Sequence, residues 1–408
     1  MAVQIQGTVV GWQIYELTHD KLALGLIGLA EALPFISFAL YAGHLADRHD
    51  RRRVAILALS VLVLCSVALL VLPLALPHNP HLVTRLIYAT IVVSGVARSF
   101  LQPARQALSQ ELVPRALFHN AVTWRSGAWQ MAAVMGPAIG GALYAVGGTT
   151  AAYTGDVVLI VIGLLAIVSI QHRSAINRDH TNDIGESLGE GLRFVFKEPI
   201  LLGALSLDLF SVFFGGATAL LPVFADEILH VGPQGLGLLR AAPAVGAVLT
   251  SLVIVHQPPF ERAGRTLALA VCGFGIFTVA FGLSTSFWLS VLMLALAGAS
   301  DMVSVSIRSN LLQTITPTHL FGRVSSVNSV FVGSSNEIGM FESGVTAQLF
   351  GTVPSVVLGG AATLVAVAVI FGRNQALRGL WRIHELGDWS GTGASSTRSE
   401  STPSPPAR

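Results

Sequence analysis

Long apolar runs, separated by short polar connections, fill the chain from its first residue to about position 372. A helix needs about 20 apolar residues to cross the hydrocarbon core of a bilayer, and most runs reach that length. The runs lack the two-residue alternation that outer-membrane strands require. We therefore predict an all-α membrane protein with about twelve transmembrane helices, over roughly 1–17, 22–43, 54–76, 83–102, 119–146, 150–171, 200–225, 235–256, 266–283, 287–307, 326–350 and 354–372.

Composition agrees with this prediction and excludes several classes of protein. Of 408 residues, 52% are hydrophobic and 11% are charged, whereas soluble chains carry about 25% charged residues. The net charge is only +2, and the cations are spread over short connections. The sequence therefore contains no basic patch that would indicate nucleic-acid binding. The two cysteines, Cys65 and Cys272, both lie inside apolar runs. We expect no disulfide framework, no metal site and no cofactor.

The cations follow every second predicted span. They stand at 48, 51–53, 105, 115, 173, 178, 193, 197, 262, 265, 308, 323, 373, 378 and 382, and the alternate connections hold almost none. Cytoplasmic connections of inner-membrane proteins are enriched in Lys and Arg. We therefore expect a multi-pass protein of the bacterial inner (plasma) membrane with both termini in the cytoplasm.

The two ends of the chain carry weaker signals. The first run is short and contains Gln4, Gln6 and Gln13, so we expect a first helix whose beginning is missing. A signal peptide is the alternative, although no basic segment precedes the run. At the other end, residues 373–389 alternate Leu and Trp with Arg and His, which suits a helix on the inner leaflet. The remaining tail is rich in Ser, Thr, Gly and Pro, and we expect disorder.

An internal repeat relates the two halves of the chain. Six residues recur at a constant offset of 203 positions, from Arg105 to Phe118 and again from Arg308 to Phe321. Repeats of this kind build secondary transporters whose substrate site lies between the halves. Chance similarity of two loops is the alternative. We predict a six-helix bundle over 1–171, a cytoplasmic linker over 172–199, a second bundle over 200–372 and a tail over 373–408.

The connection after the second span carries a recognisable motif. It reads GHLADRHDRRR over residues 43–53 and resembles the signature loop of the major facilitator superfamily. We expect Gly43 to end the helix and the arginines to stay on the cytoplasmic side. The resemblance implies that the loop gates the transporter, through Gly43, Asp47, Arg48, Arg51 and Arg52. A simple topology signal is the alternative, and Asp50 stands where the family usually has a second glycine.

A second motif lies in the fifth span, where GPAIGG occupies residues 136–141. It resembles the core of the motif found in antiporters of the superfamily, although its upstream glycines are absent. Gly136, Pro137, Gly140 and Gly141 allow close approach of helices, and a generic tight crossing explains them equally well.

Several short runs extend the resemblance over nearly the whole chain. They are GWQIYELT at 11–18, LGL at 24–26, PAR at 103–105, NE at 336–337 and ESG at 342–344. They resemble the enterobactin exporter-like (transmembrane secretion effector) branch of the superfamily. This resemblance implies export of small molecules and leaves the cargo open.

Charged residues inside the apolar runs are the best candidates for coupling. A charge at the centre of a membrane helix costs about 2.5–3.5 kcal/mol, so such residues usually face a cavity or a partner. Glu31 and Glu337 are central, followed by Asp208. We propose these three as proton carriers, with helix–helix hydrogen bonding as the alternative role. Arg98 and Asp301 are related by the same offset of 203 and are candidates for a static ion pair between the halves.

These features together predict a transporter and not an enzyme. Neither lysine follows a glycine, so a phosphate loop for ATP is absent from the sequence. We expect a monomeric secondary active exporter of small amphipathic molecules that works by alternating access, with protons and the lipid bilayer as its other partners. Proton symport or uptake is the first alternative, and a non-transporting membrane sensor on the same fold is the second.

Overall fold

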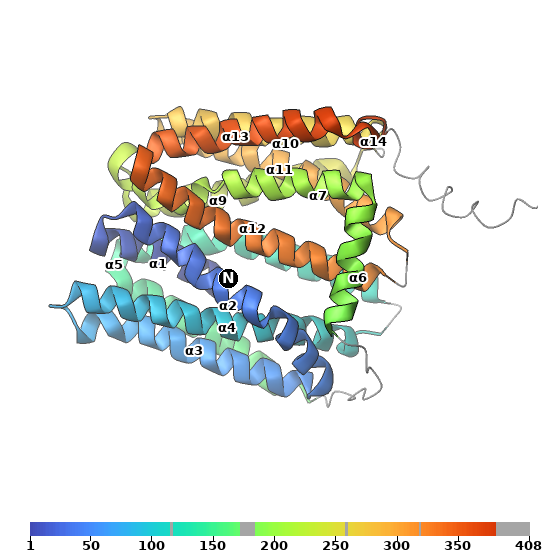
Figure 1. Ribbon diagram of the computed structural model, residues 1–408. Helices are drawn as coiled ribbons and strands as arrows, with labels where there is room; N and C mark the ends of the chain where they lie inside the picture. The colour runs from blue at the N-terminus through green and yellow to red at the C-terminus, as the bar shows by residue number, and fades with distance from the viewer. Residues whose placement is uncertain (115–116, 172–183, 258–259, 318–319, 381–408) are drawn as a thin grey trace, which may run out of the picture.

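The structure is a computed structural model of the chain, and it describes residues 1–114, 117–171, 184–257, 260–317 and 320–380. The described part is helical throughout (Figure 1). Its elements are α1 (Ala2–Thr18), α2 (Lys21–Arg48), α3 (Arg51–Ala75), α4 (Pro80–Leu112), α5 (Phe118–Ser169), α6 (Ile184–Lys197), α7 (Pro199–Phe214), η2 (Ala217–Leu220), α8 (Leu221–Val223), η3 (Phe224–Ile228), α9 (Gly232–Val255), α10 (Ala263–Leu283), α11 (Phe287–Ile315), α12 (Phe321–Phe350), α13 (Thr352–Arg373) and α14 (Gln375–Arg378).

Within the described residues, nine helices are long and apolar enough to cross a membrane. The element α5 supplies two of the predicted spans, because its backbone leaves the helical conformation at Gly147 and Gly148. Gly148 has φ +61° and ψ −156°, a conformation that only glycine adopts readily. The helix α1 has only 17 residues, and α12 carries polar residues along its length, including Asn336 and Glu337. These two complete the predicted set of spans.

Two predicted boundaries were wrong. Gly43 does not end the second helix, since α2 continues to Arg48. The third helix begins directly after Asp50. The Asp50 carboxylate caps α3 by accepting a 3.0 Å hydrogen bond from the Arg52 amide. The predicted span 200–225 breaks after Phe214, where Gly215 and Gly216 lead into a 3₁₀ turn. A Cβ at Gly216 would lie 2.5 Å from the carbonyl oxygen of Gly339, so this segment needs glycine to meet α12.

The predicted linker and tail also contain structure. Helix α6 occupies the second part of the linker and contacts α12 and α7. In the tail, the described residues end at 380, and α14 packs against α7, α10 and α13. Leu377 and Leu380 are buried there beside α10, because the backbone of Gly264 approaches closely. The rest of the predicted interfacial helix and the predicted disordered tail lie outside the described residues.

The helices pack in two groups. α1 to α5 pack on one another, and α7 to α13 form the other group. In Figure 1 the first group lies below the second, and α2 and α12 meet between them. The principal contacts between the groups are α2 with α12 and α5 with α9. The predicted bundle limits remain a prediction, and part of the linker lies outside the described residues.

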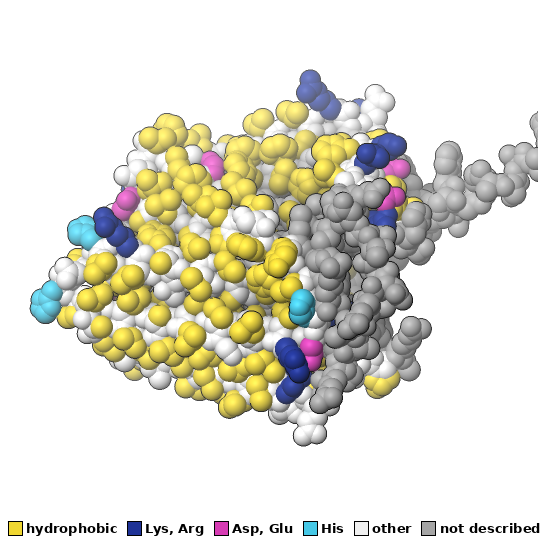
Figure 2. Space-filling view, turned by 60° about the horizontal axis from the view of Figure 1, so that its bottom comes forward, with side chains coloured by type: hydrophobic (Ala, Val, Ile, Leu, Met, Phe, Trp, Pro, Cys, Tyr) yellow, Lys and Arg dark blue, Asp and Glu magenta, His cyan; other side chains and the backbone are white. Residues whose placement is uncertain are grey.

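Apolar side chains form a broad band on one face of the molecule. Figure 2 shows hydrophobic side chains across the middle of one face, with most of the Lys, Arg, Asp, Glu and His toward its two ends. The exposed apolar side chains include Leu57, Leu64, Leu249 and Trp288. Such a band of apolar surface suits contact with lipid.

The two ends of the molecule are packed differently. We call the end with the connections at 49–50, 260–262 and 316–317 the arginine-rich end, and the end with the connections at 19–20, 76–79 and 229–231 the opposite end (Figure 1). At the opposite end one hydrophobic cluster joins both groups of helices, with Tyr15, Tyr153, Leu220, Phe224 and Phe281 among its members. Toward the arginine-rich end, the described apolar residues form clusters that stay within one group. The groups therefore share a core at one end only.

Candidate functional site

Five polar side chains from five helices form the central charged cluster. They are Gln6 on α1, Glu31 on α2, Arg98 on α4, Arg240 on α9 and Glu337 on α12. The Arg98 guanidinium donates hydrogen bonds to Glu31 Oε1 at 3.2 Å and to Gln6 Oε1 at 2.7 Å. Glu337 interacts electrostatically with Glu31, Arg98 and Arg240. The structure thus brings the two leading predicted carboxylates into one electrostatic environment, between the two groups of helices.

Close helix packing positions the two carboxylates. A Cβ at Gly28 would lie 2.5 Å from the carbonyl oxygen of Glu337 and 2.8 Å from Met340 Cβ. Gly25 and Gly344 make a similar backbone contact one turn away. These glycines let α2 and α12 cross without side chains between them. Glu337 Oε2 is enclosed and has no hydrogen-bond partner among the described residues.

Arg240 is the member of the cluster that sequence analysis did not single out. It lies inside the predicted span 235–256, so the criterion of a charge within an apolar run was sufficient to find it. Its Nη1 faces α1, where a Cβ placed on Gly7 or Gly11 would lie 3.8 Å away. It interacts electrostatically with Glu31 and Glu337.

Asp208, the third predicted proton carrier, lies outside the cluster. It forms an ion pair with Arg308, and both side chains are buried, at 5% and 7% exposure. Asp301 lies two turns before Arg308 on α11 and interacts electrostatically with both partners of this pair. The structure does not pair Arg98 with Asp301: Arg98 forms its ion pair with Glu31 in the first group, and Asp301 interacts with Asp208 and Arg308 in the second.

The signature loop makes its described contacts within the first group. Arg51 forms a 2.8 Å ion pair with Glu111 on α4, and Arg52 donates a 2.7 Å hydrogen bond to the Val168 carbonyl on α5. The side chains of Gly43, Asp47 and Arg48 lie outside what the structure describes. The gating role of the loop remains a prediction.

The motif of the fifth span lies at two close crossings. A Cβ at Gly136 would meet Gln4 Cβ at 2.5 Å, and one at Gly140 would meet Ile5 Cα at 3.2 Å, both on α1. A Cβ at Gly141 would lie 2.4 Å from the Pro233 carbonyl oxygen at the start of α9. These small residues therefore let α5 approach both α1 and the second group.

Tyrosine hydroxyls bond to polar side chains of other elements near the opposite end. Tyr15 donates to Glu227, which joins α1 to η3 and so connects the two groups. Tyr144 donates to Glu16, and Tyr153 donates to Gln13 at 2.6 Å, both within the first group. None of these pairings follows from sequence spacing, since the partners are more than a hundred positions apart.

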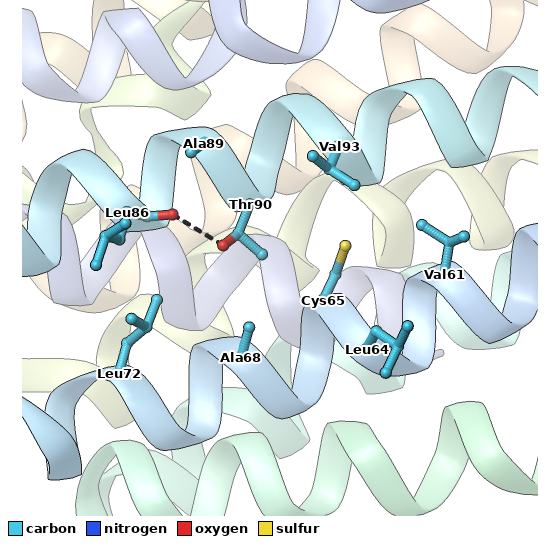
Figure 3. Close-up of a pocket in the computed structure, with 9 residues that line it drawn as sticks. All are labelled: Val61, Leu64, Cys65, Ala68, Leu72, Leu86, Ala89, Thr90 and Val93. Carbon is cyan, nitrogen blue, oxygen red and sulfur yellow. Dashed lines mark hydrogen bonds between the residues drawn. The ribbon is translucent and has the colours of Figure 1, made fainter.

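An apolar groove between α3 and α4 lies apart from the cluster (Figure 3). Its lining consists of Val61, Leu64, Cys65, Ala68, Leu72, Leu86, Ala89, Thr90 and Val93. The only hydroxyl, that of Thr90, donates a 2.8 Å hydrogen bond to the Leu86 carbonyl, as the dashed line in Figure 3 shows. A groove lined by hydrocarbon, one thiol and one bonded hydroxyl suits an apolar occupant and holds no carboxylate for proton coupling.

Comparison with known proteins identifies relatives along nearly the whole chain. The family described as transmembrane secretion effector matches residues 2–380. The enterobactin exporter EntS of Citrobacter koseri is 27% identical over 390 residues, covering 95% of this chain and 89% of the relative. The enterobactin exporter EntS of Shigella flexneri is 28% identical over 329 residues, covering 80% and 77%.

Solved structures share the fold at low sequence identity. A bacterial homologue of the iron transporter ferroportin, in an inward-facing state, has a TM-score of 0.71 at 16% identity and covers 92% of this chain and 95% of that one. The D-xylose-proton symporter has a TM-score of 0.64 at 12% identity, with coverage of 93% and 98%. These likenesses confirm the predicted major facilitator fold.

Proposed function

Because the chain belongs to the transmembrane secretion effector family of the major facilitator superfamily, we propose that it exports small amphipathic, siderophore-like molecules by proton antiport with alternating access. Membership of this family makes the chain a transporter and not an enzyme, and an integral protein of the inner membrane. The cargo class is taken from its relatives, which are named as exporters of enterobactin.

The central charged cluster is the observation that carries the proposal. Glu31 and Glu337 stand on α2 and α12, the two helices that meet between the groups. A change in the relative position of the groups changes the surroundings of both carboxylates. Carboxylates whose surroundings change can take up a proton on one side of a membrane and release it on the other. The unpartnered Oε2 of Glu337 is a suitable proton acceptor.

Unequal packing at the two ends supports alternating access. The groups share a hydrophobic core at the opposite end only. A transporter that opens on one side at a time needs such an asymmetry, because access requires separation of the groups. We propose that a single chain performs the cycle, that the arginine-rich end faces the cytoplasm, and that the chain has cytoplasmic termini.

Proton movement in proteoliposomes tests this function. Vesicles with the purified protein and an internal pH dye are challenged with enterobactin, a cationic amphiphile and a neutral drug, with protein-free vesicles as the control. We expect enterobactin to drive a proton flux opposite to its own movement. A flux in the same direction would establish symport instead. Folded protein that moves no protons with any of the three compounds contradicts the proposed function.

The contact between Tyr15 and Glu227 gives a separate prediction about the opposite end. Removing the hydroxyl in Tyr15→Phe breaks the hydrogen bond that connects α1 to η3. A hydrogen bond to a charged group contributes about 1.5–3 kcal/mol, so the local opening equilibrium should rise by about tenfold or more. Hydrogen–deuterium exchange of the amides at 224–231 measures this rise.

Tyr144→Phe is the matched control for this variant, because Tyr144 bonds to Glu16 within the first group. We expect it to leave exchange at 224–231 unchanged. Equal exchange in Tyr15→Phe and in the unmodified protein would show that the hydroxyl does not hold the groups together.

A further inference from the structure

Arg240 differs from the other cation of the central charged cluster because it has no direct partner. Arg98 is bonded to Glu31 and to Gln6. The Arg240 guanidinium has neither a hydrogen bond nor an ion pair to any residue that the structure describes, and its interactions with Glu31 and Glu337 act over a longer range. Arginine deep within a membrane protein is costly, so it is retained where it binds something.

The Arg240 residue is also not fully enclosed. Arg240 is only half-buried, and its nitrogens are not among the enclosed polar atoms that lack a partner, in contrast to Nε of Arg98. It lies eight residues into α9, about 12 Å from the end of the helix at the helical rise per residue. This depth puts Arg240 near the middle of the membrane. A partly exposed charged group at that depth faces a space between the two groups of helices and not the lipid.

Two glycines of α1 lie beside this cation. Gly7 and Gly11 are four residues apart on α1, so they share one face of that helix. A Cβ added at either glycine would lie 3.8 Å from Nη1 of Arg240, which is an ordinary van der Waals contact distance. Larger side chains at these positions would occupy the space beside the guanidinium.

From these observations we propose that Arg240, opposite Gly7 and Gly11, binds a planar pair of anionic oxygens on the cargo, as in a carboxylate. The guanidinium presents parallel N–H donors that match two adjacent oxygens, which a lysine ammonium does not do. The inference rests on the proposed function, and it adds the chemical class of group that the transporter selects.

Binding to purified full-length protein in detergent tests the site without any need for transport. The probes are 2,3-dihydroxybenzoate, which carries a carboxylate, and its uncharged methyl ester, with affinities measured by calorimetry. We expect the unmodified protein to prefer the acid over the ester by about tenfold or more, the effect of a charge-assisted hydrogen bond. Equal affinity for the two probes, or no binding of the acid, overturns the proposal.

Variants assign this preference to Arg240. Arg240→Gln should lose it, and Arg240→Lys should keep part of it, since the charge remains without the planar fork. Gly7→Leu, which retains the arginine, should weaken binding of the acid by filling the adjacent space, and this variant serves if Arg240→Gln does not fold. Arg85→Gln is the control, because Arg85 is exposed near the start of α4. An unchanged preference in Arg240→Gln overturns the proposal.

A purely electrostatic role of Arg240, neutralising Glu337, predicts a different result. In that case Arg240→Gln should cause no further loss of binding affinity once Glu337→Gln is also present. The affinities for the acid and for the ester should then change by the same factor. We expect the preference for the acid to stay lost in the double variant. If protein that shows the preference moves no cargo in vesicles, the proposed function fails and the binding site stands.

Discussion

Glu337→Gln should abolish substrate-driven proton movement in proteoliposomes. Glutamine keeps the size and shape of the side chain, but it cannot change its charge by taking up and releasing a proton. Glu337 Oε2 is enclosed without a hydrogen-bond partner among the described residues, so the substitution breaks no bond at that atom. Glu31→Gln should have the same effect on coupling, although it also weakens the contact with Arg98 at 3.2 Å.

The matched control is Glu261→Gln, at an exposed carboxylate in the connection before α10. This variant should couple like the unmodified protein. Membrane insertion and elution as a single species should be unchanged in all three variants. Normal proton coupling in both Glu31→Gln and Glu337→Gln would contradict their assignment as carriers.

Among the variants considered, Arg308→Met should lower the stability of the folded protein most. Asp208 and Arg308 are both buried and form an ion pair between α7 and α11. Removing one partner of a buried pair typically costs about 3–5 kcal/mol, because the other charge stays buried without compensation. Here Asp301 lies nearby on α11, so the variant would leave two carboxylates close together. Thermal unfolding of the purified protein in detergent measures the loss.

The double variant Asp208→Leu with Arg308→Met separates a structural role from proton coupling. Replacing both partners by apolar groups is often neutral or stabilising, so we expect stability to recover. If the pair is structural, Asp208→Asn lowers the unfolding temperature without changing the number of protons moved per cargo. A stable Asp208→Asn protein that has lost coupling would instead support the sequence-based prediction that Asp208 carries a proton.

The two copies of the internal repeat differ in the surroundings of their equivalent residues. Arg105 and Arg308 are equivalent by the offset of 203, yet Arg105 is exposed and Arg308 is buried in an ion pair. The position equivalent to Asp208 is Ile5, so the first half has no carboxylate to form the matching pair. The repeat therefore predicts the arrangement of helices and does not predict the charges between them.

The central charged cluster was accessible to sequence analysis only in part. Glu31, Glu337 and Arg98 are visible as charges within apolar runs, and the same signal marks Arg240. Which of them meet depends on the rotation of five helices about their axes. The pairing of Arg98 with Glu31 and Gln6, in place of Asp301, follows from that rotation.

The sequence by itself determined the class of protein, the spans and the family, because the length of an apolar run and a short loop motif are local properties of the chain. Only the tertiary structure decided which charges are neighbours, which end has a core shared by both groups, and which arginine of the central charged cluster has no direct partner among the described residues. These properties depend on contacts between residues far apart in the chain. Glycines such as Gly28 and Gly141 permit those contacts, and their effect is visible only when the opposing backbone is in place.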